Sequence, residues 1–248
     1  MSSIDHKYDQ KRNYYHEYFE RDTQFNAVTL YYHKQILAYL RRLVPDVTAI
    51  TEVGAGFGYI AHLCKLQRIG YNGIEINSRQ AMRLRDQGFD VEGASLRDVR
   101  EDFPFHKCVL LSHVLEHMDG VNAASEFLQV LMRRQRPGDH LLVVCPDALD
   151  WKGYFWDGDW SHSYPTTLRR TAQLLRECGY RTLVCKHWIG PGWTNPLLVE
   201  IYRIAMRLFP MRLVDWIAQD LLGKTQLGLR FMSAYGWRQC VVLAKKSE

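Results

Sequence analysis

From residue 47 onward, short apolar runs alternate with longer amphipathic stretches, and this alternation limits the fold more than any other feature of the sequence. Runs of this length read as strands and the stretches between them as helices. The expected strands cover 47–53, 71–76, 90–94, 107–112, 140–146, 181–188 and 238–245, and the expected helices cover about 57–69, 78–88, 121–135 and 166–178. The pattern predicts an α/β fold with a mostly parallel sheet of seven strands and helices on both faces. Gly70, Gly88 and Gly179 follow three of the helical stretches, and we expect them to end those helices.

Two regions lie outside this alternation. Residues 1–45 read as helix with a tyrosine-rich first part, and residues 190–236 separate the last two expected strands. We therefore predict a core formed by 46–189 and 237–248, an N-terminal helical region, and a helical insert before the last strand.

The composition is that of an ordinary globular protein. Of the 248 residues, 47% are hydrophobic, which is enough for a full core. We find neither a long uncharged apolar stretch nor an N-terminal secretory signal, so we expect a cytoplasmic location. The six cysteines contain no C-x-x-C pair, which argues against a zinc ribbon. The net charge of +5 is spread along the chain and does not by itself indicate a partner.

Three glycines follow the first expected strand in the stretch TEVGAGFGYIAHL, residues 51–63. Gly54, Gly56 and Gly58 give the spacing G-x-G-x-G, whereas a dinucleotide-binding loop would need glycine where Tyr59 stands. A phosphate-binding P-loop would need Gly-Lys-Ser/Thr, which the stretch lacks. Glu52 lies just before the loop and would repel a pyrophosphate but suit an ammonium group. The loop therefore indicates a ligand with a positive charge at this end.

Glu75 closes the second expected strand. A carboxylate at this position can accept hydrogen bonds from both ribose hydroxyls. An adenosine whose other end carries amino, carboxylate and sulfonium groups fits both Glu75 and the loop beside Glu52. The alternative for Glu75 is an ordinary carboxylate at the end of a surface strand.

At this point the sequence resembles the class I S-adenosylmethionine-dependent methyltransferases. The matching stretches are EVGAGFG (52–58), GIEIN (73–77), EGASLRD (92–98), LLSHVLEHM (110–118) and RPGDHLLVVCPD (136–147). The resemblance covers roughly residues 47–188 and the last strand. It implies a Rossmann-like sheet and S-adenosyl-L-methionine as the cofactor.

The resemblance also implies which residues bind the cofactor. They would lie around the methionine end (Glu52, Gly54, Ala55, Gly56, Gly58 and Tyr59), around the ribose and adenine (Glu75, Ile76, Ser95 and Leu96), and where the fourth strand opens into the active site (Ser112 and His113). The tyrosine-rich residues 8–18 would form part of a helical lid over the cofactor.

Methyl transfer from a sulfonium needs a general base only if the acceptor must lose a proton. For a hydroxyl acceptor the candidates are His113, His117 and His162. We favour His162, because the stretch around it resembles a pattern of small-molecule methyltransferases of the ubiquinone-biosynthesis and glycan-modifying kind, in which this loop covers the acceptor. The alternatives are that His162 only orients its loop and that His117 packs at a helix start.

A divalent ion could be collected by oxygen ligands and one imidazole, namely Asp147, Asp157, Asp159 and His162. Solvated loop carboxylates are the commoner explanation of such a set, so we predict no metal.

The acceptor is less constrained than the reaction. An aromatic group could stack on a ring or simply pack its loop: Trp151, Tyr154, Phe155, Trp156, Trp160 and Tyr164. We predict O-methylation of a small molecule or glycan, including a lipid-linked one. The alternatives are RNA methylation and a catalytically silent module that binds cofactor or a partner protein. Nucleic acid is the less favoured substrate, because the fourth strand ends in SHVLEH rather than in the turn typical of base methyltransferases.

The insert contains an apolar helix with Glu200 and Arg203 on one narrow stripe, which Pro210 should break or kink. Its segment 197–222 could lie on a membrane as a peripheral contact, cover a lipid-linked acceptor, or pack within the protein or a dimer. We favour packing within the protein or a dimer, because amphipathic helices usually bury their apolar face in protein. A monomer and a homodimer both fit the sequence.

Overall fold

The structure is a computed structural model. It describes residues 27–189, 195–208 and 236–247, and between the last two ranges residues 210, 213, 214, 216, 217, 220 and 232. The tyrosine-rich segment 8–18 and most of 209–235 lie outside the described residues. The expected lid and the division into core and insert therefore stay predictions.

The core is one sheet of seven strands in the order β3-β2-β1-β4-β5-β7-β6. The strands are β1 (Ala49–Val53), β2 (Gly70–Ile74), β3 (Val91–Glu92), β4 (Cys108–Ser112), β5 (His140–Pro146), β6 (Tyr180–Trp188) and β7 (Gln239–Lys246). The pairings from β3 to β5 are parallel, and β7 runs antiparallel to both β5 and β6. The predicted fold class, a mostly parallel α/β sheet, is thereby confirmed.

Helices follow the strands as the alternation predicted. They are α3 (Tyr59–Gln67), α4 (Ser78–Asp86), α5 (Gly120–Arg134) and α8 (Leu168–Glu177). The two regions outside the alternation contain α2 (Ala27–Leu43) and α9 (Pro196–Arg207). Three short helical segments were not predicted: η1 (Leu115–His117), α6 (Ala148–Trp151) and α7 (Tyr154–Asp157). Side chains cap several of them: Asn77 accepts hydrogen bonds at the start of α4, and Thr167 at the start of α8.

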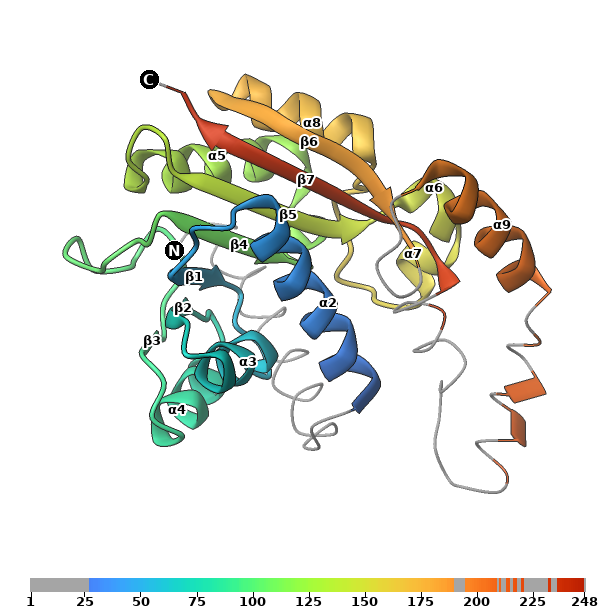
Figure 1. The fold of residues 1–248 in the computed structure, drawn as a ribbon, viewed down its shortest axis with the longest axis horizontal. Coiled ribbons are helices and arrows are strands. Elements are labelled where there is room, and N and C mark those ends of the chain that lie inside the picture. The colour runs from blue at the N-terminus through green and yellow to red at the C-terminus, as the bar shows by residue number, and fades with distance from the viewer. Residues whose placement is uncertain are drawn as a thin grey trace, which may run out of the picture.

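The central strands bury alternate residues on opposite faces of the sheet. On β4, Leu110 packs with α2 and α3, whereas Val109 and Leu111 pack with α5 and α8. Figure 1 shows α2 and α3 on one side of the sheet and α5 and α8 on the other. Because both faces are covered, the strands read as continuous apolar runs.

One predicted helix stop is wrong. Gly70 does not end α3 but begins β2, and the residue that leaves the helix in a left-handed conformation is Arg68, with φ 56°. A side chain at Gly70 would lie 2.8 Å from Cβ of Ala49 on the neighbouring strand, so this glycine serves close strand packing. Gly88 and Gly179, by contrast, do adopt positive φ just after their helices.

Helix α9 ends before Pro210, as its sequence predicted, but its polar stripe faces inward. Arg203 lies 3.3 Å from Asp150 and also binds Glu200. The apolar side chains stand in solvent instead: Leu197, Ile201, Ile204 and Leu208 are 69, 55, 58 and 82% exposed. Packing of this face within the core is therefore wrong for these four residues, whereas packing in a dimer stays a prediction. No helix in the described part of the chain is long and apolar enough to cross a membrane.

Candidate functional site

The glycine loop joins β1 to α3, and all three of its glycines need the left-handed region. Gly54, Gly56 and Gly58 have φ of 85°, 51° and 77°, which side chains disfavour. A Cβ at Gly54 would lie 2.7 Å from Val114, and one at Gly58 only 2.3 Å from Leu84. The loop is therefore packed on one side against α4 and on the other against the turn that follows β4.

Glu75 follows β2 and is tied to the middle of this loop. Its Oε2 accepts a hydrogen bond from the backbone N–H of Gly56 at 2.7 Å, and its Oε1 accepts one from Asn77 N–H at 2.8 Å. The side chain is 5% exposed, and burial raises its pKa, although these backbone donors act to lower it. The two carboxylate oxygens together have four lone pairs, so the group retains acceptor capacity for a ligand.

Glu52 lies on β1 beneath the loop. It is 3% exposed, and its carboxyl accepts a hydrogen bond from the Tyr71 hydroxyl at 2.7 Å. Burial raises its pKa to about 8, while the Tyr71 hydrogen bond opposes this rise and the charge of Glu75 adds to it. The carboxyl is thus mostly protonated at neutral pH, and contact with an ammonium group remains a prediction.

The other predicted cofactor residues differ in accessibility. Ala55 and Leu96 are buried among apolar side chains, and Tyr59 is buried against the rings of His33 and Phe57, whereas Ile76 is 45% exposed. Ser95 donates a hydrogen bond to Asp98 at 2.5 Å. Ser112, at the end of β4, has a buried hydroxyl with no hydrogen-bond partner among the described residues, which leaves it available to a ligand.

His113 follows β4 in a left-handed conformation, with φ 57°. Such backbone geometry in a residue with a side chain is costly and concentrates at functional sites. Its Nε2 lies 2.9 Å from the hydroxyl of Tyr32 on α2, and its Nδ1 lies 3.1 Å from Glu116. On the same helix, His33 stacks on Tyr59 with ring centroids 4.9 Å apart. Helix α2 therefore contacts both the glycine loop and the end of β4.

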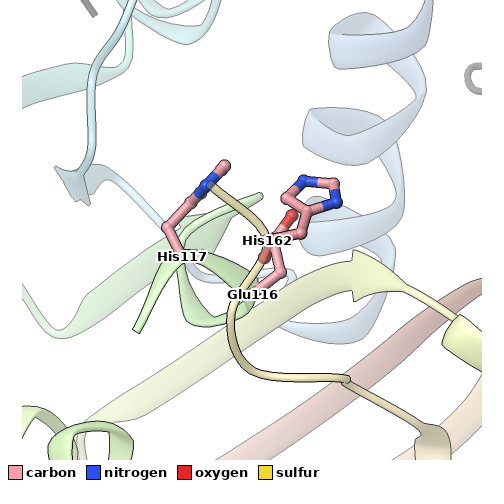
Figure 2. Close-up of side chains that lie close together, drawn as sticks. All are labelled: Glu116, His117 and His162. Atoms are coloured by element: carbon pink, nitrogen blue, oxygen red, sulfur yellow. The ribbon is translucent and has the colours of Figure 1, made fainter. Parts of the chain in front are cut away.

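Three side chains gather beside His113. A carboxylate oxygen of Glu116 and one ring nitrogen each of His117 and His162 lie within 4.8 Å of one another. Figure 2 shows how η1, which carries Glu116 and His117, meets the loop that carries His162. The backbone also joins these segments, because Tyr164 N–H donates to the carbonyl of Glu116 at 3.0 Å. Sequence reasoning chose both histidines but missed Glu116.

Glu116 is ionised despite being completely buried. Burial acts to raise its pKa, but the hydrogen bond and charge of His113 and the charges of His117 and His162 outweigh it, so the pKa is lowered. The pKa of His117 is lowered by burial, against the charge of Glu116. The carboxylate of Glu116 therefore lies among the imidazole rings of His113, His117 and His162.

The oxygen-rich metal set considered from the sequence is not brought together in the described residues. Asp147 instead lies 3.1 Å from His187 and 3.2 Å from Arg238, and it groups with His187 and Cys240. Asp159 accepts hydrogen bonds from both the backbone and the hydroxyl of Ser161.

The predicted aromatic pocket is only partly available. Phe155 and Tyr164 are buried core residues, so they cannot stack on an acceptor. Trp151 and Tyr154 line a cavity of about 570 Å³ with Arg203 and Trp237, whose ring stacks on Tyr154 at 5.1 Å.

Comparison with known proteins identifies the fold. No protein-family model matches the sequence, and no curated protein matches it. Among solved structures, the Burkholderia thailandensis 1,6-didemethyltoxoflavin-N1-methyltransferase, with bound 1,6-didemethyltoxoflavin and S-adenosylhomocysteine, is 12% identical with a TM-score of 0.61, covering 100% of this chain and 92% of that one. A SAM dependent methyltransferase from Archaeoglobus fulgidus is 18% identical with a TM-score of 0.59, covering 94% of this chain and 100% of that one.

The same architecture also occurs in SpnF, described as a cyclase. It is 17% identical with a TM-score of 0.55, covering 84% of this chain and 80% of that one. These likenesses establish the class I methyltransferase fold for this chain. The SpnF match illustrates that the fold alone does not fix the reaction.

Proposed function

We propose that the protein is an S-adenosyl-L-methionine-dependent methyltransferase. The observation that carries this proposal is the 2.7 Å hydrogen bond between Glu75 and the N–H of Gly56. It brings the acid at the end of β2 against a glycine loop of the spacing expected for an adenosyl sulfonium, in a fold shared with structures described as methyltransferases. In open α/β sheets, ligands bind at this carboxyl edge of the strands.

In this proposal each group of residues at the carboxyl edge of the sheet contacts a different part of the cofactor. The loop glycines let the methionine end approach the backbone, Glu75 binds the ribose hydroxyls, and exposed Ile76 covers one adenine face. The unpaired hydroxyl of Ser112 is available to the ligand beside them. Transfer is then an in-line displacement that depends on positioning and on exclusion of water.

We infer that the acceptor atom is an oxygen of a small molecule or glycan. A hydroxyl must lose its proton in the reaction, and the histidine-rich end of β4 is the part of the edge equipped to assist. His113 and His117 lie there, on the turn against which Gly54 packs, and the loop that carries His162 meets this turn. An amine acceptor would need no such group once it is neutral.

Titration calorimetry with S-adenosylmethionine, ATP and NAD tests the cofactor. We expect binding of S-adenosylmethionine alone, weakened roughly 10- to 100-fold in Glu75→Gln, because charge-assisted hydrogen bonds are worth about 1.5–3 kcal/mol. Glu126→Gln is the matched control, since Glu126 pairs with Arg97 on the exposed surface. Binding of NAD or ATP in place of S-adenosylmethionine would refute the proposal.

Turnover is tested by incubating the protein with methyl-labelled cofactor and a metabolite or glycan extract. Label in a small molecule together with S-adenosylhomocysteine supports the proposal. Cofactor binding without turnover on any extract would favour the silent binding module, and label in added RNA would favour RNA methylation.

The exposed apolar side chains of α9 support a peripheral membrane contact through 197–222. Leu197, Ile201, Ile204 and Leu208 recur at the spacing of one helix face, and all four stand in solvent. Such a contact would place the protein beside a lipid-linked acceptor. Flotation with anionic liposomes tests it; a protein that stays in the dense fraction and forms a dimer would show that the face is a subunit contact.

A further inference from the structure

The cluster of Glu116, His117 and His162 contains a buried carboxylate whose hydrogen-bonding capacity is largely unused. Glu116 is fully buried, and neither of its carboxylate oxygens has a hydrogen-bond partner of good geometry among the described residues, although His113 Nδ1 lies 3.1 Å away. Buried charges are normally paired and hydrogen-bonded, or bound to a metal. Apart from the ion pair with His113, the carboxylate thus has no partner of good geometry among the described residues, and a cation would supply one.

The hydrogen bonds of His162 fix which of its nitrogens can bind a metal. Its Nδ1 lies 2.5 Å from the carbonyl oxygen of Phe155. A carbonyl only accepts, so the proton is on Nδ1 and the lone pair is on Nε2. A ring N–H bound to a backbone carbonyl is the usual outer contact of a metal-ligating histidine.

The same reasoning applies to His117. Its Nδ1 lies 2.9 Å from the hydroxyl of Ser161, and that hydroxyl donates its only proton to Asp159 at 2.5 Å. Ser161 must therefore accept from His117, which places the proton on Nδ1 and the lone pair on Nε2. The chain Asp159–Ser161–His117 orients this ring as the Phe155 carbonyl orients the other.

We propose that Glu116, His117 and His162 bind a divalent transition-metal cation. The two imidazole rings lie with centroids 4.9 Å apart beside the carboxylate, and a carboxylate oxygen of Glu116 and one ring nitrogen of each histidine lie within 4.8 Å of one another. Two histidines and one carboxylate suit Mn²⁺, Fe²⁺, Co²⁺ or Zn²⁺ and leave further coordination positions open. This ligand set differs from the aspartate-rich set considered from the sequence, and it replaces our expectation that the protein binds no metal.

The role of the ion rests on the proposed function. A cation here would lower the pKa of an acceptor hydroxyl, whose proton would pass to solvent. The acceptor oxygen then forms the bond to the methyl carbon, and the electrons of the broken carbon–sulfur bond return to sulfur, so the sulfonium becomes a neutral thioether. His162 would act as a ligand rather than as the free base that we favoured from the sequence.

The test uses Co²⁺ as the probe, without cofactor. The full chain is treated with chelator, desalted and titrated with Co²⁺, and binding is followed by calorimetry and by the visible absorption of the ion. We expect one ion per chain, with binding weakened at least tenfold in Glu116→Gln and in His162→Ala, and roughly tenfold in Ser161→Ala. His187→Ala is the matched control, because His187 belongs to the other cluster with Asp147 and Cys240, and it should bind as the unmodified protein does.

Thermal unfolding in chelator shows whether each variant is folded; Ser161→Ala keeps all three ligands and serves if a ligand variant does not fold. Absence of stoichiometric Co²⁺ binding, or a loss confined to His187→Ala, overturns the proposal. Metal binding that persists in a protein with no affinity for S-adenosylmethionine would refute the proposed function but not the metal site. Methyl transfer that is unaffected by chelator, in a protein that does not bind Co²⁺, would refute only the metal site.

Discussion

Glu52 should make the protein less stable as the pH rises, and Glu52→Gln should remove this dependence. Burial raises the pKa of the carboxyl from 4.5 to about 8, so between these values the folded state holds a proton that the unfolded state has lost. Stability must then fall as pH rises through this window and level off above it. At about 1.4 kcal/mol per pKa unit, the cost of keeping Glu52 is roughly 3 kcal/mol at pH 7 and approaches 5 kcal/mol at pH 9. The glutamine amide oxygen can still accept the hydrogen bond from Tyr71.

Urea unfolding of both proteins at intervals from pH 5 to pH 9 measures this difference. The free energy of unfolding of Glu52→Gln minus that of the unmodified protein should grow by about 1.4 kcal/mol per pH unit up to pH 8 and then stay constant. Titrating groups that do not interact with Glu52 are common to both proteins and cancel in the difference. A difference that stays constant within about 0.5 kcal/mol over the whole range would refute the reasoning, since a carboxyl with an ordinary pKa adds no slope above pH 6.

Two further predictions concern the loop and α9. Gly58→Ala should destabilise the protein by about 2–4 kcal/mol and abolish cofactor binding, because φ is 77° and the new Cβ would lie 2.3 Å from Leu84. Gly153→Ala is the control, since there is open space around this residue, and it should change the unfolding free energy by less than about 0.5 kcal/mol. Equal unfolding free energies for the two variants would contradict the expected backbone strain and steric clash at residue 58. Ile204→Glu should reduce liposome flotation at least tenfold, since burying an isoleucine side chain is worth about 1.5–3 kcal/mol. Leu66→Glu, at an exposed apolar position on α3, should not reduce it. Flotation unchanged in Ile204→Glu would exclude this face of α9.

The sequence predicted the order and nature of the main elements because the central strands β1, β4 and β5 are buried on both faces and the helices show their own period. It also placed Glu75 and the glycine loop together, since both follow strands that run in parallel and end at the same edge. The boundaries of α3 could not be predicted in the same way. Arg68 takes the left-handed position there although a glycine stands two residues later, because the glycine is needed for packing against Ala49.

The candidate site was predicted less completely. Glu116 lies in the stretch LLSHVLEHM and could have been noticed as an acid between apolar residues, but only the structure shows that it is buried and lies beside His162, a distant residue in the chain. The inward face of α9 was hidden for a related reason. From the sequence, its charged stripe would be expected to face solvent. The structure places Asp150 and Arg238 opposite this stripe, where they pair with its charged residues.

The attachment of α9 to the core includes ion pairs as well as the buried side chain of Val199. Arg203 binds Asp150, and Arg238 on the approach to β7 lies 3.4 Å from Glu200. Dissolved ions screen partly exposed pairs of this kind. Concentrated salt would therefore loosen the helix itself as well as its attraction to an anionic bilayer, and loss of lipid binding in salt would combine two separate effects. Repeating the measurement with uncharged lipid would isolate the contribution of the helix anchorage.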